Sequence, residues 1–249
     1  MMNCFSVMVI GNNPEEQMAQ FNASLKVQPY LKYKINDASE LHKKAILTVE
    51  NMIFEMNDNP IILEYLHNHL SEIKEMTDIE YFSFLTNKLS HDEDGNAWDD
   101  SNPNGKWTSY NIGKENSIEL IKNDGTITMQ CRKGDVDWSA IHLAKQQIYK
   151  RTWEMVIENQ TPKHDADKIM LGIMGDKKDY LLNFKTKDIY IKYNTSYWNY
   201  AVIKDGVWKD TDNQNSIDWV INFYETFVEP LNDDELITIY EYQMNDAND

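Results

Sequence analysis

Two apolar, β-rich runs stand near the two ends of this chain and set the main constraint on its fold. Residues 4–10 read CFSVMVI and end at Gly11-Asn12-Asn13, which predicts a buried strand followed by a turn. Residues 235–243 read ELITIYEYQ, which predicts a closing strand. The segments between these two strands therefore decide the fold class.

Helical patterns fill much of the interval. Three consecutive helices are predicted over 37–90, because helix-start signals occur at Asp37, Pro60 and Thr77. A long helix is predicted from Asp137, and another over about 217–228 after Ser216 as N-cap.

Strand patterns alternate with these helices. Turns are predicted at Asn123-Asp124-Gly125 and at Asp205-Gly206. The predicted strands cover 27–35, 106–113, 117–125, 126–131, 188–193 and 197–208. This order predicts an α+β fold with an antiparallel, ferredoxin-like (split βαβ) sheet and a helical insertion.

The domain organisation follows from the same pattern. We expect a single α+β domain over 1–249 with a three-helix insertion at about 37–90. Residues 91–105 read HDEDGNAWDDSNPNG, which predicts a long acidic loop. The 41% hydrophobic content is enough to build a core of this size.

The charge restricts the class of partner. The chain has 24 Lys and Arg against 41 Asp and Glu, a net charge of −17. Such a surface repels nucleic-acid phosphates and anionic membranes, and it attracts basic proteins. Two isolated cysteines and no apolar run of about 18 residues favour a reducing cytoplasm without membrane insertion.

No chemical motif stands out. Neither a Gly-rich phosphate loop nor a nucleophile–histidine arrangement is present. Asp92, Asp94 and Asn96 match the start of a calcium loop, but Ala97 stands where glycine is needed and no glutamate closes the motif. We therefore predict no catalytic residues, no metal site and no bound cofactor.

Two acidic clusters are the candidate partner-binding residues. Between Asp205 and Asp249 twelve acidic residues face one lysine, so this stretch carries most of the net charge. Carboxylates at loop ends can imitate the phosphates of a nucleic-acid backbone. The predicted interface residues are Asp92, Glu93, Asp94, Asp99, Asp100, Asp210, Asp212, Asp218, Asp233, Asp234 and Glu235.

An alternative site is a small-molecule pocket. Aromatic side chains with a nearby cation could bind a nucleotide signal or another small ligand. The candidates for this pocket are Trp107, Tyr110 and Trp208, with Lys106 or Lys114 as the cationic anchor.

Three stretches resemble an uncharacterised family of bacteriophage and prophage proteins. They are FSVMVIGNNPEEQMAQFN (5–22), NPNGKWTSYNIG (102–113) and YAVIKDGVWKD with FYETFVEPLNDDELITIYEYQ (200–243). Family members often continue with Gly-Gly-Arg-Trp where this chain has Lys114-Glu115-Asn116 after Gly113. They often carry a Gly/Trp-rich segment where this chain reads TDNQN (211–215). Their closing strand often ends in Cys-His, whereas here it reads IYEYQ (239–243). The resemblance implies a phage origin with the family's pocket replaced.

These observations lead to one functional hypothesis and two alternatives. The hypothesis is a phage-encoded, non-enzymatic inhibitor of a host defence protein, such as a CRISPR effector or restriction enzyme, acting in the bacterial cytoplasm. Its carboxylates would bind a basic surface that normally holds nucleic acid. The alternatives are a small-molecule or nucleotide-signal sponge or weak enzyme, and a phage structural or assembly protein.

Overall fold

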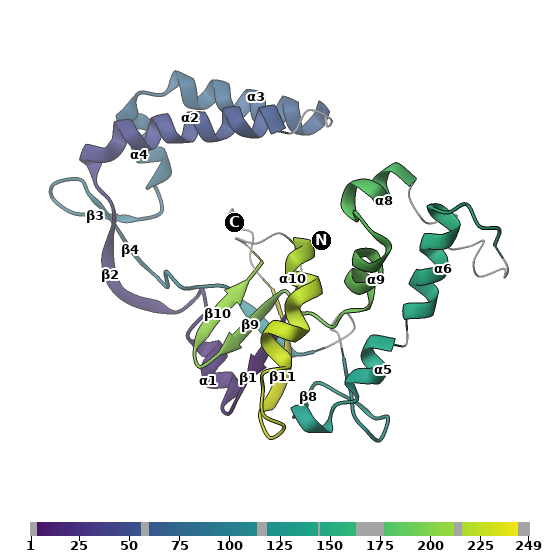
Figure 1. Cartoon of the computed structure of the whole chain (residues 1–249). Helices are drawn as coiled ribbons and strands as arrows, with labels where there is room; N and C mark the ends of the chain where they lie inside the picture. The colour runs from purple at the N-terminus through teal and green to yellow at the C-terminus, as the bar shows by residue number, and fades with distance from the viewer. Residues whose placement is uncertain are drawn as a thin grey trace. The chain divides into compact units, whose positions relative to one another are not determined.

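The chain is mixed α/β with open sheets and divides into two compact units. The computed structural model describes residues 4–55, 60–113, 119–143, 145–162, 177–211 and 216–243 (Figure 1). We call Ser24–Pro103 the helical unit, and Met1–Ala23 with Asn104–Asp249 the sheet unit. The insertion expected at 37–90 is thus only part of the helical unit, which also has strands of its own.

The main sheet belongs to the sheet unit. Its strands follow the order β10-β9-β1-β11-β5, and β8 also pairs with β11. The strands are β1 (Cys4–Ile10), β5 (Ser109–Ile112), β8 (Gln130–Arg132), β9 (Ala201–Lys204), β10 (Val207–Asp210) and β11 (Leu236–Gln243). The first and last strands lie side by side and antiparallel, from Cys4 opposite Gln243 to Ile10 opposite Ile237.

One pairing contradicts the expected antiparallel sheet. Strand β1 pairs in parallel with β9, so the sheet is mixed and a ferredoxin-like topology is not confirmed. The burial of the β9–β10 hairpin gives the reason. Residues 201–203 of β9 are at most 2% exposed, whereas Val207 of β10 is 55% exposed. The more apolar strand therefore takes the central place beside β1, and β10 becomes the edge.

The two faces of this sheet pack against different elements. Met8 and Ile10 of β1 face a core formed with helix α10 (Ser216–Phe223), which lies across one face of the sheet in Figure 1. Val7 and Val9 face the opposite core, which includes Met18 of helix α1 (Pro14–Ala19). This alternation follows from the two-residue period of a strand.

Shorter elements complete the sheet unit. A small hairpin turns at Gly125, whose φ of +82° fits the predicted turn. The remaining elements are β6 (Leu120–Ile121), β7 (Ile127–Thr128), the 3-10 helix η2 (Lys133–Asp135), α5 (Trp138–Leu143), α6 (Gln146–Val156), α8 (Lys177–Asn183), α9 (Lys187–Thr195) and the π-helix η3 (Tyr224–Val228). The single long helix predicted after Asp137 is therefore wrong, since two helices occupy that stretch.

The strand predicted at 188–193 is also wrong, because this segment forms helix α9. The Thr186 hydroxyl caps the helix by accepting a hydrogen bond from the Ile189 backbone N–H at 3.3 Å. Tyr190 is then 3% exposed and packs against the rings of Trp153 and Phe184. Capping and aromatic packing outweigh the strand propensity of Ile and Tyr.

The helical unit is built on a helical hairpin and a three-stranded sheet. Helices α2 and α3 pack along each other, and α4 packs on α2. The elements are β2 (Lys26–Tyr33), the 3-10 helix η1 (Ile35–Asp37), α2 (Ala38–Glu55), α3 (Pro60–Glu75), α4 (Asp78–Leu85), β3 (Ser90–His91) and β4 (Ala97–Ser101). Thr77 and Glu80 form the predicted capping box at the start of α4.

The long acidic loop predicted over 91–105 is corrected by this sheet. Strands β3 and β4 form a hairpin within it, and β4 also pairs with β2. Ala97 is 0% exposed and belongs to the core under α4. Burial of this residue fixes the second strand, whereas the composition of the segment had favoured a loop.

A buried histidine joins the three helices of this unit. His42 of α2 is 7% exposed, and its Nδ1 lies 2.8 Å from a carboxylate oxygen of Asp78. Its Nε2 lies 2.9 Å from the Ile73 carbonyl oxygen. Because a carbonyl only accepts hydrogen bonds, both ring nitrogens act as donors when His42 is protonated. The Asp78 carboxylate, helped by the Ile73 carbonyl, raises the pKa of His42.

None of the described helices is both long enough and apolar enough to cross a lipid bilayer.

Candidate protein-binding surface

The first acidic cluster lies in the β3–β4 hairpin of the helical unit, and most of it serves the fold. The Asp92 carboxylate accepts hydrogen bonds from the Asn96 backbone at 2.9 Å and from Trp98 Nε1 at 3.0 Å. The hydrogen bond from Trp98, together with those from Asn96 and Asp94, lowers the pKa of Asp92 to about 2. The Asp92 carboxylate therefore holds the turn between β3 and β4 in place through the hydrogen bonds that it accepts.

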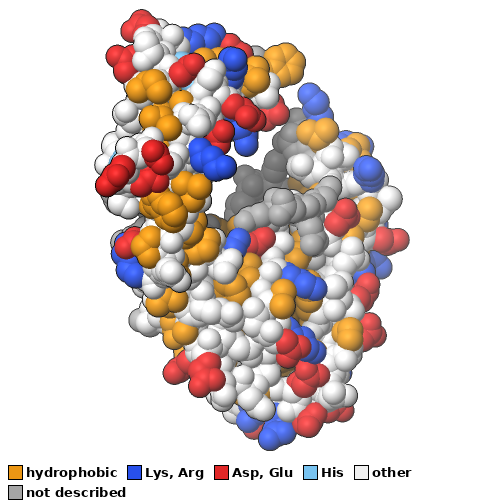
Figure 2. Space-filling model, turned by 90° about the vertical axis from the view of Figure 1, so that its left-hand side faces the viewer, with side chains coloured by type: hydrophobic (Ala, Val, Ile, Leu, Met, Phe, Trp, Pro, Cys, Tyr) orange, Lys and Arg blue, Asp and Glu red, His pale blue; other side chains and the backbone are white. Residues whose placement is uncertain are grey.

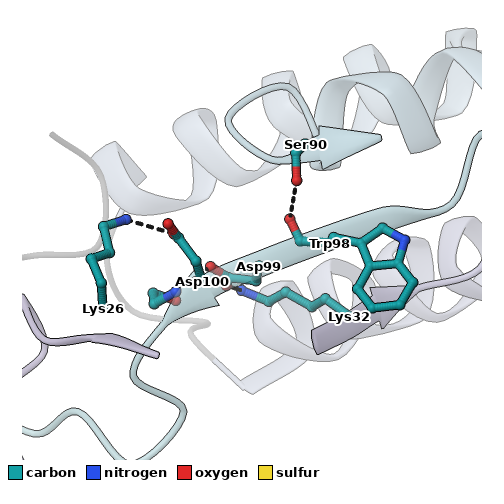
Figure 3. A network of polar contacts seen from close by, with 7 residues as sticks. Lys26, Lys32, Ser90, Trp98, Asp99 and Asp100 are labelled. Carbon is teal, nitrogen blue, oxygen red and sulfur yellow. Dashed lines mark hydrogen bonds and ion pairs between the residues drawn. The ribbon is translucent and has the colours of Figure 1, made fainter. Parts of the chain in front are cut away.

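Two further carboxylates of this cluster are neutralised by lysines of β2 (Figure 3). Asp99 lies 2.6 Å from Lys32 Nζ, and Asp100 lies 2.6 Å from Lys26 Nζ. Although burial by itself raises the pKa of Asp99, the hydrogen bond from Lys32 and those from Ser101 lower it to about 2. These pairs bind β2 to β4.

In the described part of this cluster, two carboxylate side chains face solvent outside this network, although the Asp94 backbone N–H also donates to Asp92. Glu93 and Asp94 are both exposed at the hairpin turn. They are the predicted residues of this cluster that remain available to a partner.

The second acidic cluster, in the sheet unit, is also largely engaged. Asp210 Oδ2 accepts hydrogen bonds from Lys106 Nζ at 3.0 Å and from Trp208 Nε1 at 2.8 Å. Glu235 lies 2.9 Å from Lys204 Nζ, and this contact, with a hydrogen bond from the Asn232 backbone, lowers its pKa.

The other members of the second cluster lie nearer the surface. Asp233 is 3.5 Å from Lys133 Nζ with a side chain that is 84% exposed. Asp218, in the first turn of α10, and Asp234 are exposed. Asp212 lies outside the described residues. The described members of this cluster are thus not all free carboxylates, because Asp210 and Glu235 each face a lysine.

The predicted small-molecule pocket is a packed aromatic core. Trp107 is 5% exposed and donates a hydrogen bond from Nε1 to the Met18 carbonyl at 3.1 Å. Tyr110 packs edge-on against Trp107 at 4.7 Å, and Trp208 belongs to the same cluster. Lys106 faces Asp210, as described above, and Lys114 lies outside the described residues. Trp107, Tyr110 and Trp208 thus pack together on the face of the sheet that contacts α1, and the ligand-binding role expected for them stays a prediction.

The most distinctive surface was missed by the sequence analysis: an apolar groove on the helical unit. Sixteen large apolar side chains are exposed among the described residues, and ten of them belong to this unit, which is about a third of the chain. Two of these ten, Met52 and Tyr65, line the groove itself. Figure 2 shows apolar side chains in contiguous groups on one face, with acidic side chains beside them. Exposure on this scale is unusual for a surface that faces only water.

The groove, which we call the α2–α3 groove, has a volume of about 540 Å³. Its floor includes the buried residues Val49, Leu66 and Ile73. Its rim includes Met52, which is 45% exposed, and Tyr65, which is 67% exposed. Helix α4 has only eight residues, against eighteen in α2, so it covers a part of this face and leaves the rest open.

One sequence signal could have indicated that the helical unit has exposed apolar side chains. Helix α3 begins PIILEYL, with three consecutive apolar residues that point around the helix. Ile61, the first of these three residues, is 79% exposed. A helix with more apolar residues than one face can bury requires a second apolar neighbour.

No protein-family model, curated protein or solved structure matches this chain. Membership of the phage family therefore stays a prediction.

Proposed function

We propose that this protein is a non-enzymatic inhibitor that binds a basic partner protein through its helical unit. The observation that carries the proposal is the α2–α3 groove, a volume of about 540 Å³ with an apolar floor and exposed apolar rims. A two-helix hairpin buries its apolar face fully only when a further element packs on it. Amphipathic helices from partner proteins commonly occupy such grooves.

Charge identifies the kind of partner. Residues 24–103 contain seven lysines and fifteen Asp and Glu, a net charge of −8. Glu55, Glu64, Glu93 and Asp94 are exposed around the helices and the hairpin turn. A basic, amphipathic segment would make apolar contacts in the groove and would be attracted by the negative charge of this unit. A second copy of this chain would be repelled by the same charge.

The phage resemblance and the total charge give the biological setting. The proposed target is a basic, nucleic-acid-binding protein of a bacterial host, such as a CRISPR effector or a restriction enzyme, met in the host cytoplasm. The groove replaces the carboxylate row as the main contact. The field of the remaining carboxylates speeds association and weakens with salt.

A capture experiment with matched variants tests this proposal. The tagged full-length chain is incubated with a lysate of a low-GC bacterium at low and moderate salt. It is compared with the double variant Met52→Ser/Tyr65→Ser and with Leu182→Ser, a control whose side chain is 77% exposed on the sheet unit. Circular dichroism checks that each variant keeps its helices.

The expected result is one basic, nucleic-acid-handling protein that the wild type and Leu182→Ser both retain. The double variant should lose it, because the apolar contact is gone, and moderate salt should weaken the capture. Equal retention by the double variant would exclude the groove. A wild-type dimer in light scattering that becomes a monomer in the double variant would show that a second copy occupies the groove instead.

A further inference from the structure

A separate cavity lies on the sheet unit, between the β9–β10 hairpin and the π-helix η3. Its volume is about 370 Å³, within the range of roughly 300–1,000 Å³ that small-molecule sites occupy. Its apolar lining includes Ile10, Val202, Val207, Phe227 and Leu231, and its charged lining residues are Lys204, Asp205 and Lys209. A second hollow of about 500 Å³ shares Lys209, Thr226 and Phe227 with it, so the two adjoin at these three residues.

The cation at this junction has no acidic partner among the described residues. Lys209 Nζ lies 5.7 Å from the centre of the Phe227 ring. Other lysines of the sheet unit, such as Lys106, Lys192 and Lys204, each face a carboxylate. In a chain with 41 acidic and 24 basic residues, a lysine placed over a ring instead of a carboxylate is available to an external anion.

The backbone of η3 shapes this junction. The Glu229 N–H donates to the Tyr224 carbonyl at 2.9 Å, which is the i to i+5 pattern of a π-helix. The wider turn contains Thr226 and Phe227, which both line the cavity. Single π turns within helices often occur at functional sites.

We propose that this cavity binds a small monoanion with an apolar body, of the carboxylate class. The carboxylate lies at the junction, against the Lys209 ammonium and the Thr226 hydroxyl. The apolar body packs over Val202 and against Phe227 and Leu231. Of the two lysines that line the cavity, Lys204 is paired with Glu235, so Lys209 supplies the one ammonium without a carboxylate partner among the described residues. One available cation, without a Gly-rich loop, favours a ligand with a single negative charge over a polyphosphate. This site is independent of the proposed protein-binding function.

Calorimetric titration of the full-length chain tests the site with 2-naphthoate, octanoate and the neutral analogue 2-naphthamide. The expected result is saturable, one-site binding of a carboxylate, with the amide at least tenfold weaker. Preference for naphthoate or for octanoate tells an aromatic from an aliphatic body. Lys209→Met should weaken carboxylate binding at least tenfold, while Lys150→Met, which removes an exposed lysine of α6, should leave it unchanged.

Two results would overturn the proposal. One is the lack of saturable binding of either carboxylate by the wild type at millimolar concentration. The other is binding to Lys209→Met that equals binding to the wild type, which would place the ligand elsewhere, for example in the apolar α2–α3 groove. Because Lys209 is exposed, its replacement should not unfold the chain, and circular dichroism verifies this.

Discussion

The Lys32–Asp99 ion pair allows a test of whether the Asp99 carboxylate stabilises the fold or binds a partner. Asp99 was predicted to bind a partner, yet its side chain is only 7% exposed and lies 2.6 Å from Lys32 Nζ. The Ser101 backbone N–H also donates to it at 2.8 Å. Asp99→Asn should therefore destabilise the helical unit, whether or not a partner is present.

The size of this effect follows from the pKa. Asp99 titrates at 3.8 when exposed and at about 2 in the folded chain. This difference corresponds to about 2 kcal/mol of folding free energy. Because the folded pKa is the lower one, the contribution is fully present above about pH 4 and is lost as the pH falls through about 2. Lys32→Met should cost about 2–3 kcal/mol, since it leaves a buried carboxylate with only the hydrogen bonds from Ser101.

Urea unfolding followed by circular dichroism at 222 nm measures these changes from pH 7 down to pH 2.5. Asp94→Asn and Lys34→Met are matched controls, because both side chains are exposed. The deficit of Asp99→Asn should shrink below pH 4, and the double variant Lys32→Met/Asp99→Asn should cost less than the sum of the single variants. A deficit at pH 7 no larger than that of the controls would refute the structural role of this pair.

Three other predictions concern single side chains. Because the pKa of His42 is raised, this residue should stabilise the fold below pH 6.5, and the stabilisation should be lost as the pH rises through the pKa of the folded state. The unfolding free energies of the wild type and His42→Gln, measured between pH 6 and 9, check this. A difference between the two that does not decrease with pH would contradict it. Asp210→Asn should lower the unfolding free energy by about 1–3 kcal/mol, because the Asp210 side chain is 11% exposed and accepts hydrogen bonds from Lys106 and Trp208. An unchanged midpoint of urea unfolding would show that these contacts are dispensable for stability. Gly206→Ala should lower the unfolding free energy by about 1–2 kcal/mol, because the φ of Gly206 is +72° and the added Cβ would lie 3.0 Å from a side-chain atom of Gln20. A melting temperature equal to that of the wild type would contradict this.

Local signals in the sequence predicted much of the fold. Asp205-Gly206 forms the expected tight turn, with φ of 52° and 72°, and joins β9 to β10. The terminal strands also form as expected and pair with each other. The error at 188–193 arose because strand propensity was weighed without the cap at Thr186. The parallel β1–β9 pairing had no local signal, since it depends on which strand of a hairpin is buried.

The candidate site was harder to predict, because charge in a sequence does not show its partner. Asp99 and Glu235 read as surface acids, but each meets a lysine more than thirty positions away. The aromatic residues Trp107 and Trp208 read as pocket walls, but they pack into one core. Ile61 is the reverse case, because it is an apolar residue of a predicted helix and yet is 79% exposed.

The acidity and the exposed apolar groove explain each other. An open apolar face on the helical unit would favour association between copies of the chain. A net charge of −17 on the chain, with −8 on this unit alone, opposes that association through repulsion between like charges. In the proposed function, a basic partner would be attracted by the same negative charge that keeps two copies of the chain apart. The carboxylates would then select which protein approaches, and the apolar groove would supply the contact area that holds it. Under this proposal, many acidic side chains contribute without direct contact with the partner.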